Sequence, residues 1–460
     1  MIQPASEDKT QKRITLLVTT LSSFITPFMG SAINIGLPAI GHEFNITAVM
    51  LSWVATSYLL ATAVFLVPAG KIADIYGRKR IFAAGILIFT AAAFMCATAG
   101  SPFILISWRI LQGIGSAMIF GTSTAILTSV FPLGERGKAL GINVATVYTG
   151  LSVGPFIGGI LTQNLGWRYI FFCTIPLGII VFLVLMKLKG EWADAKGEKL
   201  DVKGAVVFVL MLICLMYGFS QLPSKNGILL MAAGILGLLT FIRIETSIGN
   251  PVLNISLFRE NVTFTFSNIA ALINYSATSA VAFLLSLYLQ YIKLMTPQQA
   301  GIILVAQPVF MALVSPFAGR LSDKAEPRII SSVGMAIIAV GLFMLFFVGQ
   351  ETSTAYIIAG LVFLGIGFGL FSSPNTNAIM SSVEKRFYGV ASATLATMRL
   401  SGQMMSMAFS IMIFSIFIGN VRVAPSNFAA FIMGVKVLFL IFALLCVLGI
   451  FASLARGKLR

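Results

Sequence analysis

The stretch from Gly70 to Arg80, GKIADIYGRKR, is a basic, glycine-bearing connector between two long apolar segments. A second stretch, WRILQGIGSAM from Trp108 to Met118, places Arg109 inside an apolar run. A charge within a membrane helix is energetically expensive and marks a functional site by default, and a basic loop between such helices sets their orientation. Together the two stretches indicate a membrane protein that moves a solute across a bilayer.

The composition also favours a membrane class. Hydrophobic residues make up 58% of the chain and charged residues only 10%, with a mean hydropathy of +0.97. Soluble domains carry about a quarter charged residues, so water is excluded as the main solvent. The net charge of +16 lies in short loops and not along one face, which argues against nucleic acid as a partner.

Apolar segments long enough to cross a bilayer, which takes roughly 20 residues, recur along the whole chain. We therefore expect an all-α polytopic membrane protein with fourteen transmembrane helices. The predicted helices lie near residues 14–38, 49–70, 81–100, 103–130, 138–162, 168–187, 204–222, 227–245, 262–291, 299–318, 329–349, 355–381, 387–417 and 428–455.

Basic residues distinguish the two sides of the membrane. One set of alternate loops, together with both chain ends, holds most of the Lys and Arg residues. The opposite loops hold only Arg168, Lys225, Lys293 and Arg422. Positively charged loops stay in the cytoplasm, so both termini are expected there, and the localisation that follows is the cell membrane (plasma or inner membrane) with multiple passes.

An internal repeat divides the chain into halves. The pattern Gly-base-x-x-Asp that begins at Gly70 recurs at Gly319, each time at the cytoplasmic end of the second helix of a six-helix set. Two matched halves with solute held between them are a recurring plan of transporters. We expect an N-terminal six-helix bundle, an inserted two-helix segment peripheral to the transport path, and a C-terminal six-helix bundle, at residues 1–190, 191–255 and 256–460.

These stretches resemble the major facilitator superfamily, specifically its fourteen-helix drug:proton antiporter branch. GKIADIYGRKR is similar to the loop between the second and third helices, WRILQGIGSAM to the fourth-helix motif, and GLSVGPFIGG, residues 150–159, to the fifth-helix antiporter motif. GWRYIFF and the regions 274–291 and 371–403 extend the similarity over essentially the whole chain. The resemblance implies two six-helix bundles with two extra central helices, alternating access, and multidrug efflux or another export of amphipathic small molecules.

One departure concerns the coupling ion. The branch carries an aspartate in its first helix, within a stretch that ends in Asn-x-x-Leu-Pro. Here the stretch reads MGSAINIGLP: Asn34, Leu37 and Pro38 are retained, but Met29 occupies the acidic position. The acidic residues of the predicted helices lie at helix ends or in loops. The resemblance implies proton antiport, whereas the missing carboxylate argues against it.

Two groups of residues are candidates for gating. The first group, from the repeated loop motif, comprises Gly70, Asp74, Gly77, Arg78, Gly319 and Asp323. The second group, from the antiporter motif, comprises Gly150, Gly154, Pro155, Gly158 and Gly159. The glycines also have a purely structural interpretation, because small residues let helices approach closely. Asp74 and Arg78 are four residues apart and can form a local ion pair.

Polar residues within the predicted helices should face the bundle interior, because lipid offers no hydrogen bonds. Candidates for coupling or for the substrate path are Met29, Asn34, Tyr58, Arg109, Gln112, Tyr148, Asn274, Gln290, Asn375, Asn377 and Arg399. Arg109 and Arg399 predict an electropositive cavity that favours neutral, zwitterionic or anionic substrates. In the alternative interpretation, helix carbonyls cap both arginines and hide them from the path.

Transport is the favoured function. The expected partners are a small-molecule or lipid-like amphipathic substrate, membrane lipids and, from the resemblance, protons. A lipid or lipid-precursor flippase of the same superfamily is the alternative, and a polytopic membrane enzyme is a weaker one, because the chain lacks clustered carboxylates and has a single histidine. No GxxxxGK[ST] motif indicates ATP binding. We expect a monomer without cofactor or metal.

Overall fold

Long apolar runs fold into helices here because lipid offers backbone groups no hydrogen-bond partner, so each segment must satisfy its own N–H and C=O groups. The computed structural model describes residues 5–198, 200–222, 224–247, 258–259, 261–322, 324–384, 388–419 and 421–457. Within this part of the chain, 14 helical spans are long and apolar enough to cross a membrane. The predicted number of spans is confirmed.

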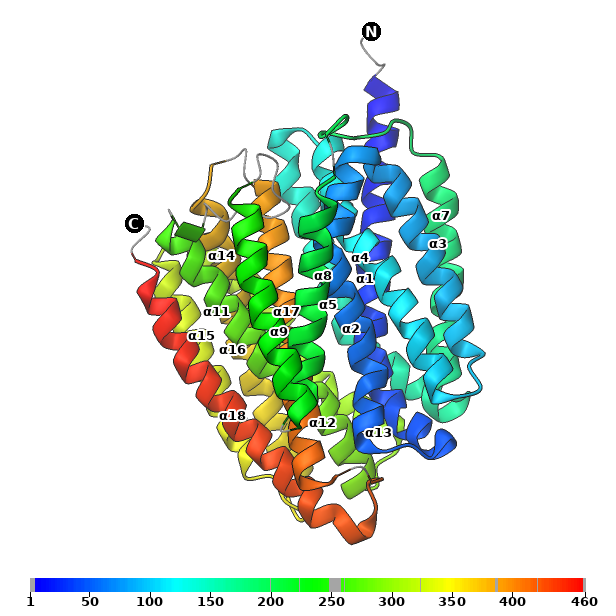
Figure 1. The fold of residues 1–460 in the computed structure, drawn as a ribbon, viewed down its shortest axis with the longest axis vertical. Helices are drawn as coiled ribbons and strands as arrows, with labels where there is room; N and C mark the ends of the chain where they lie inside the picture. Colours follow the sequence, from blue (N-terminus) through cyan, green and yellow to red (C-terminus); the bar gives the residue numbers. More distant parts are fainter. Residues whose placement is uncertain are drawn as a thin grey trace.

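The two halves and the inserted pair follow one another along the chain (Figure 1). The N-terminal half consists of α1 (Ala5–Phe44), α2 (Ala48–Tyr76), α3 (Arg78–Ala97), α4 (Pro102–Val130), α5 (Leu133–Asn164), α6 (Arg168–Phe172) and α7 (Thr174–Met186). The inserted pair consists of α8 (Val202–Ser220) and α9 (Lys225–Glu245). The C-terminal half consists of α11 (Val262–Thr278), α12 (Val281–Leu287), the π-helix η1 (Tyr288–Ile292), α13 (Pro297–Leu304), α14 (Ala306–Ser322), α15 (Pro327–Phe346), α16 (Thr354–Ser381), α17 (Tyr388–Phe417), the 3₁₀ turn η3 (Pro425–Asn427) and α18 (Phe428–Ala455).

Side-chain caps fix where several helices begin. The hydroxyl groups of Ser101, Ser224 and Ser353 each accept a hydrogen bond from the N–H group three residues further on, at the starts of α4, α9 and α16. The first N–H groups of a helix have no partner within the helix, and a serine before the first turn satisfies one of them.

Two predicted spans are interrupted by proline, which corrects their prediction as continuous helices. The span near 168–187 divides after Phe172, and the span near 299–318 divides after Leu304. Pro176 and Pro308 lie four residues beyond these two positions. Because proline has no N–H, the carbonyl groups of Phe172 and Leu304 lose the donor that would continue each helix.

A third predicted span, near 262–291, divides without proline. The N–H of Ala280 donates to Ser406 Oγ of α17 at 2.9 Å instead of to the carbonyl four residues earlier. The helix resumes as α12 and ends in the π-helix η1, a form that occurs mostly as a local irregularity at functional sites. A contact from another helix therefore breaks this span, which periodicity could not predict.

The packing places α8 at a seam between the halves. Within the N-terminal half α1 packs on α5, and α2 and α3 pack on α4, whereas α16 packs on α14 and α15 in the C-terminal half. Helix α8 packs on α9 and lies against both α2 and α17, in front of these helices in Figure 1. Helix α8 therefore lies at the boundary between α2 of the N-terminal half and α17 of the C-terminal half.

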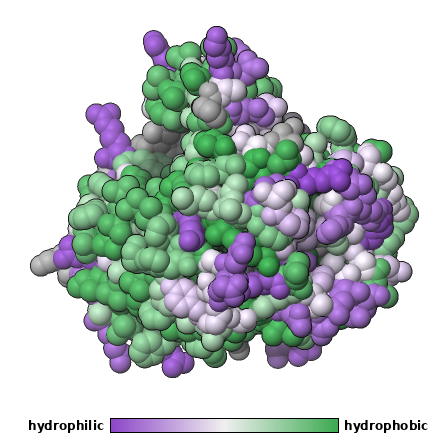
Figure 2. Space-filling view, turned by 90° about the horizontal axis from the view of Figure 1, so that it is seen from below, coloured by the Kyte–Doolittle hydropathy of each residue, from purple (hydrophilic) through white to green (hydrophobic). Residues whose placement is uncertain are grey.

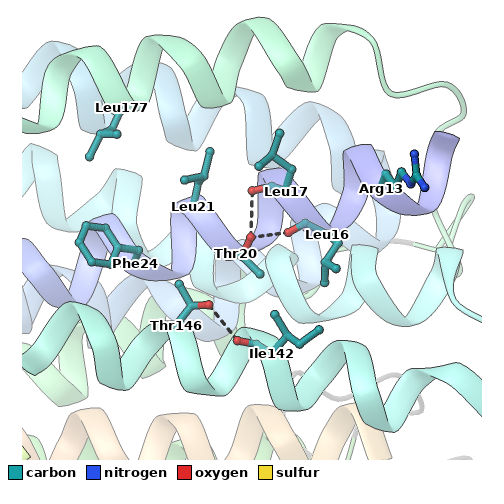
Figure 3. A pocket seen from close by; sticks show the side chains of 9 residues that line it. All are labelled: Arg13, Leu16, Leu17, Thr20, Leu21, Phe24, Ile142, Thr146 and Leu177. Atoms are coloured by element: carbon teal, nitrogen blue, oxygen red, sulfur yellow. Dashed lines mark hydrogen bonds between the residues drawn. The ribbon is translucent and has the colours of Figure 1, made fainter. Parts of the chain in front are cut away.

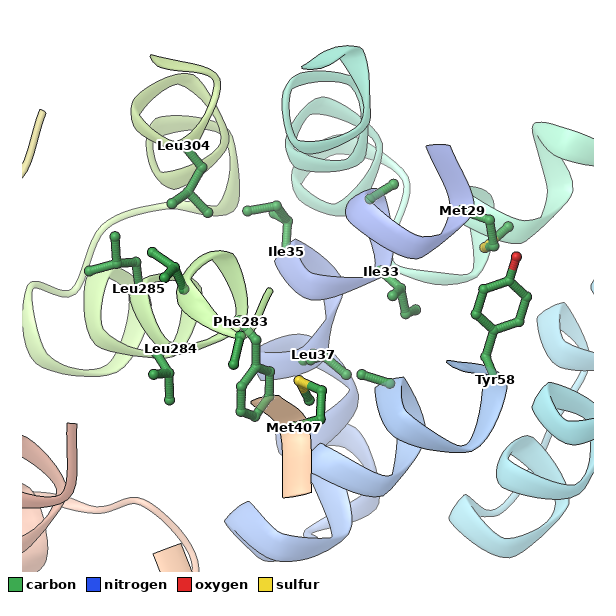
Figure 4. Packing of buried hydrophobic residues seen from close by; sticks show 14 of the residues in the cluster. Met29, Ile33, Ile35, Leu37, Tyr58, Phe283, Leu284, Leu285, Leu304 and Met407 are labelled. Carbon is green, nitrogen blue, oxygen red and sulfur yellow. The ribbon is translucent and has the colours of Figure 1, made fainter. Parts of the chain in front are cut away.

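The halves lean apart toward one end. Figure 1 shows the upper end of α18 far from α1, at the end of the molecule that carries both termini. By the distribution of basic loops, this upper end is cytoplasmic. Hydrophobic side chains of both halves pack together nearer the outer end, where Leu37 of α1 lies beside Phe283 of α12 and Met407 of α17 (Figure 4).

Candidate functional site

The two halves are joined by hydrogen bonds at the outer end, opposite the termini. Pro38 in α1 has no N–H, so the carbonyl group of Asn34 lacks its helical donor. Ser286 Oγ of α12 donates to this carbonyl at 2.6 Å, and Gln290 Nε2 donates to the carbonyl of Ile35 at 3.1 Å. The Asn-x-x-Leu-Pro stretch thus presents a free acceptor to the opposite half.

Further contacts extend this joint across the outer loops. Arg422 Nη1 donates to Asn45 Oδ1 at 2.7 Å, and the N–H of Gln298 donates to Gln163 Oε1 at 3.3 Å. We call these contacts and those of Ser286 and Gln290 the outer closure. Figure 2 looks onto this end: atoms fill its centre, with hydrophilic patches among hydrophobic residues.

The antiporter-motif glycines of α5 lie where two other helices approach. Cβ atoms built on Gly150 and Gly154 would lie 2.6 Å from the carbonyl oxygen of Phe24 and 1.9 Å from Ser31 Oγ, both in α1. A Cβ on Gly158 would lie 2.9 Å from the Ala32 carbonyl oxygen, also in α1. These three positions therefore need glycine.

The same helix also contacts the opposite half. A Cβ on Gly159 would lie 2.6 Å from the carbonyl oxygen of Pro297, where α13 begins. In return, a Cβ on Gly301 of α13 would lie 2.3 Å from the carbonyl oxygen of Pro155. Helix α5, with Pro155 in its interior, is thus packed between α1 and α13.

A polar and aromatic cluster lies at mid-depth between the halves. The hydroxyl groups of Tyr148 in α5 and Ser372 in α16 share a hydrogen bond of 2.8 Å. The guanidinium carbon of Arg399, which is half-buried, lies 5.3 Å from the ring centre of Tyr275, and that ring packs edge-on against Phe368 at 5.4 Å. Of these residues the sequence predicted Tyr148 and Arg399. We call the five residues the central cluster.

Arg109 is sealed inside the N-terminal half. Its side chain is 0% exposed, its Nε donates to the carbonyl of Val54 at 3.2 Å, and its Nη1 donates to Gln112 Oε1 at 2.7 Å. Its guanidinium lies 4.3 Å above the ring of Tyr58, a favourable cation–π distance. The capped arrangement therefore describes Arg109, and only Arg399 of the two arginines lies in the central cluster.

Tyr58 and Met29 belong to the same interior. The hydroxyl of Tyr58 bonds Ser116 Oγ at 2.8 Å. Met29 is 0% exposed and lies beside the hydroxyl end of Tyr58 (Figure 4). The first-helix acid that the resemblance implies at position 29 would thus lie next to this tyrosine and arginine.

A second buried arginine, which the sequence analysis missed, organises the C-terminal half. Arg456 follows α18, is 1% exposed, and its Nη1 donates to Asn375 Oδ1 at 2.9 Å and to Ser267 Oγ at 3.2 Å. Burial and the neighbouring Arg328 lower the pKa of Arg456 to about 10, so it stays charged at neutral pH. In the sequence, Arg456 is only a basic residue directly after an apolar run. Basic residues that merely set the orientation of a membrane helix occur at the same kind of position.

The other predicted polar residues of this half are dispersed. Asn377 Nδ2 donates to Ser322 Oγ at 2.9 Å near the cytoplasmic end. Asn274 is 0% exposed, and neither atom of its amide has a hydrogen-bond partner among the described residues. Asn375 accepts a hydrogen bond from Arg456 through its Oδ1 atom. Among the described residues, no hydrogen bond joins Asn274, Asn375 or Asn377 to the central cluster.

The repeated loop motif is described fully only in its first copy. Asp74 Oδ1 accepts from Arg78 Nε at 2.7 Å, so the predicted local pair is present. Gly70 of α2 faces Gly121 of α4, with 4.0 Å between its Cβ position and the Gly121 carbonyl oxygen. In the second copy, a Cβ on Gly319 would lie 2.9 Å from Ser373 Oγ. Asp323 lies outside the described residues.

A lateral groove of about 550 Å³ runs between α1, α5 and α7 (Figure 3). Its lining is almost wholly apolar, with Arg13 near the cytoplasmic end and Phe24 deeper in the membrane.

Two packed bundles, a glycine-mediated joint between them and a polar cluster at mid-depth define a polytopic membrane transporter. The chain belongs to the Major Facilitator Superfamily, because the family model matches residues 19–266 and 267–458. It falls in the drug-efflux-like branch of that superfamily, as the resemblance implied.

Curated relatives cover most of the chain. The riboflavin transporter RibZ of Clostridioides difficile (strain 630) is 31% identical over 441 residues, which is 96% of each chain. The multidrug resistance protein Stp of Mycobacterium tuberculosis (strain CDC 1551 / Oshkosh) is 29% identical over 86% of this chain and 74% of its own length.

Solved structures show the same fold. A peptide transporter POT in complex with sulfate has a TM-score of 0.71 at 12% identity and covers 95% of this chain and 94% of its own. A bacterial homologue of the human lysosomal transporter Spinster, in an inward-facing and unoccupied conformation, has a TM-score of 0.70 at 17% identity and covers 97% of each chain.

Proposed function

We propose that the protein is a secondary active transporter that works by alternating access and exports amphipathic small molecules from the cytoplasm. The observation that carries this proposal is the outer closure. Hydrogen bonds between the halves gather at the outer end, whereas the cytoplasmic ends lean apart (Figure 1). This is the arrangement expected of an exporter that is ready to receive solute from the cytoplasmic side.

The central cluster supports a proposal for the substrate class. Arg399 on Tyr275, with Phe368 and the Tyr148–Ser372 pair nearby, offers aromatic faces, one positive charge and two hydroxyl groups. Such a surface suits flat aromatic molecules that are neutral or anionic. Riboflavin, the substrate in the name of one relative, belongs to this class, whereas a lipophilic cation is repelled by an uncompensated arginine.

We propose that the first helix does not couple transport to protons. Met29 cannot titrate, and the described acidic residues lie at helix ends or in connectors. We propose that export is driven by a gradient other than that of protons, through a coupling group other than a carboxylate in α1.

Transport in proteoliposomes tests this function. Purified protein is reconstituted with riboflavin, an anionic dye and a lipophilic cation, each with and without a pH gradient. We expect saturable movement of riboflavin and of the anion that is largely independent of the gradient. Movement at the rate of protein-free liposomes for every compound would contradict the proposal, and cation export driven by the pH gradient would contradict the substrate class and the coupling.

A lipid or lipid precursor is the second candidate substrate. The lateral groove between α1, α5 and α7 favours it, because an acyl chain fits its apolar lining and a phosphate fits Arg13. A fluorescent anionic phospholipid in the same proteoliposomes distinguishes the two: translocation that is faster with protein and lost in Arg13→Gln supports the lipid, and unchanged translocation excludes it.

A further inference from the structure

The connector between α7 and α8 is bound to the loop that carries the repeated motif. It crosses the cytoplasmic end of the N-terminal half in Figure 1. Its acidic residues meet the bases of the loop in pairs: Glu198 binds Lys71 at 2.8 Å, Asp194 binds Arg78 at 2.7 Å, and Glu191 lies 3.7 Å from Arg80. Asp194 shares Arg78 with Asp74.

Backbone hydrogen bonds add a second kind of contact. The first two N–H groups of α3, those of Arg78 and Lys79, have no partner within the helix. The N–H of Arg78 donates to the carbonyl of Trp192, and the N–H of Lys79 donates to Glu191 Oε1, both at 2.8 Å. A carboxylate at a helix N-terminus is favourable electrostatically as well.

Gly77 makes room for this contact. Its φ of +118° lies in a region that side chains rarely adopt, and a Cβ on it would lie 2.6 Å from Cδ of Glu191. The signature glycine therefore serves both the turn between α2 and α3 and the approach of the connector.

The connector leads directly into α8. Glu198 precedes Asp201, whose Oδ1 accepts from the N–H of Gly204 and caps the helix. Beyond the cap, α8 packs on α2 through a hydrophobic cluster in which Phe208 and Met211 meet Val64. At its cytoplasmic end, α8 is thus tied to the N-terminal half by ion pairs, hydrogen bonds and packing.

The outer end of α8 reaches the C-terminal half. Phe219 packs edge-on against Phe409 of α17 with 4.8 Å between ring centres, and Met216 lies against a cluster that includes Leu400 and Met404 of the same helix. Because α8 contacts both halves, a rotation of one half relative to the other must change its contact with at least one of them.

We propose that residues 187–198 form a strap that fixes α8 and α9 to the N-terminal half, with Glu191, Asp194 and Glu198 as positioning residues. When the halves rock, the inserted pair moves with α2 and α3, and its contact with α17 slides or opens. The inserted pair is then part of one moving body. This inference rests on the alternating access of the proposed function.

Three spin-label pairs test the strap in the full chain. Labels at Met186, Lys203 and Ile329 report the ends of α7, α8 and α15, so the Met186–Ile329 distance measures the rocking of the halves. The Ser286→Ala/Gln290→Ala variant weakens the outer closure and supplies a second state. We expect the Met186–Lys203 distance to stay constant between wild type and variant while the Lys203–Ile329 distance changes with that of Met186–Ile329.

The opposite pattern, a constant Lys203–Ile329 distance with a changing Met186–Lys203 distance, would overturn the strap. Exchanging the charges of Glu198 and Lys71 gives a second test, which does not require the halves to move. Glu198→Lys or Lys71→Glu alone should broaden the Met186–Lys203 distance distribution, and the double exchange should restore it. Singles that leave the distribution unchanged, or a double exchange that fails to restore it, overturn the strap.

The two proposals fail separately. A Met186–Ile329 distance that never changes under any condition overturns the proposed alternating access. In that case the strap is decided by the charge exchange alone.

Discussion

Met29 occupies the position at which the antiporter branch carries an aspartate. It is buried beside Tyr58, and Arg109 lies 4.3 Å above that ring. One Nη atom of Arg109 has no hydrogen-bond partner among the described residues. A carboxylate at position 29 would therefore find a hydroxyl group and a positive charge close by.

We predict that Met29→Asp makes export of a lipophilic cation depend on a proton gradient. The new carboxylate supplies both a titratable group and a negative charge in a dry interior, where charges interact strongly. Dye efflux from proteoliposomes measures the effect, and Met29→Asn, which is similar in size but does not titrate, is the control. Equal efflux by both variants would show that position 29 does not control coupling.

The two interior arginines should differ in function. Arg399→Gln should reduce the preference for an anionic over a matched cationic amphiphile by tenfold or more, which corresponds to about 1.4 kcal/mol, because Arg399 lies in the central cluster. Arg109→Gln should lower the melting temperature and leave that preference unchanged, because Arg109 is sealed within the N-terminal half. A preference that follows Arg109 instead would contradict the assignment of the cluster.

At the scale of elements, α5 depends on close contact with α1. We predict that Gly154→Leu abolishes transport with membrane insertion retained, because its Cβ alone would lie 1.9 Å from Ser31 Oγ and overpacking costs about 1–3 kcal/mol. Gly141→Leu in the same helix is the matched control, since nothing lies within 4 Å of its Cβ position. Substrate uptake and membrane yield are measured for both. Wild-type turnover in Gly154→Leu would refute the close-packed joint.

Helix existence could be predicted from hydropathy, but helix continuity could not. The breaks after Phe172 and Leu304 have a local cause in Pro176 and Pro308, four residues on, and a closer reading of the sequence can find them. The break before α12 has a distant cause, because Ser406 of α17 takes the N–H of Ala280. Only the tertiary arrangement reveals such a competitor.

The candidate site shows the same division. The pair of Asp74 with Arg78 follows from their spacing of four residues, and the glycines of α5 follow from the resemblance of their stretch to the antiporter motif. No sequence pattern identifies Ser286 or Asp194 as a site residue. Ser286 donates to the carbonyl that Pro38 leaves without a donor, and Asp194 pairs with Arg78. Only the fold brings these residues to their partners.

At the scale of the molecule, the signature loop lies on the cytoplasmic side that must change shape. We predict that Asp74→Asn changes the ratio of inward- to outward-facing protein by up to about fivefold, because partly exposed ion pairs contribute about 0.2–1 kcal/mol. Cysteine accessibility on both sides measures the ratio. Glu135→Gln, which loses a pair with Lys12 in the same half, is the control and should change nothing. Unchanged accessibility with lost transport would argue against a gating role for Asp74.

Alternating access requires that the outer closure open in every transport cycle. Asn45→Cys/Arg422→Cys, in a chain whose four native cysteines are replaced by alanine, places one thiol in each half where the native side chains are 2.7 Å apart. Glu43→Cys/Arg168→Cys is the control, because that outer pair lies within the N-terminal half. Riboflavin transport in proteoliposomes is measured before and after a short, reducible cross-link. We predict that the cross-link stops transport in the first variant, that reduction restores it, and that the control is unaffected. Transport that continues at the uncross-linked rate with the halves joined would contradict alternating access.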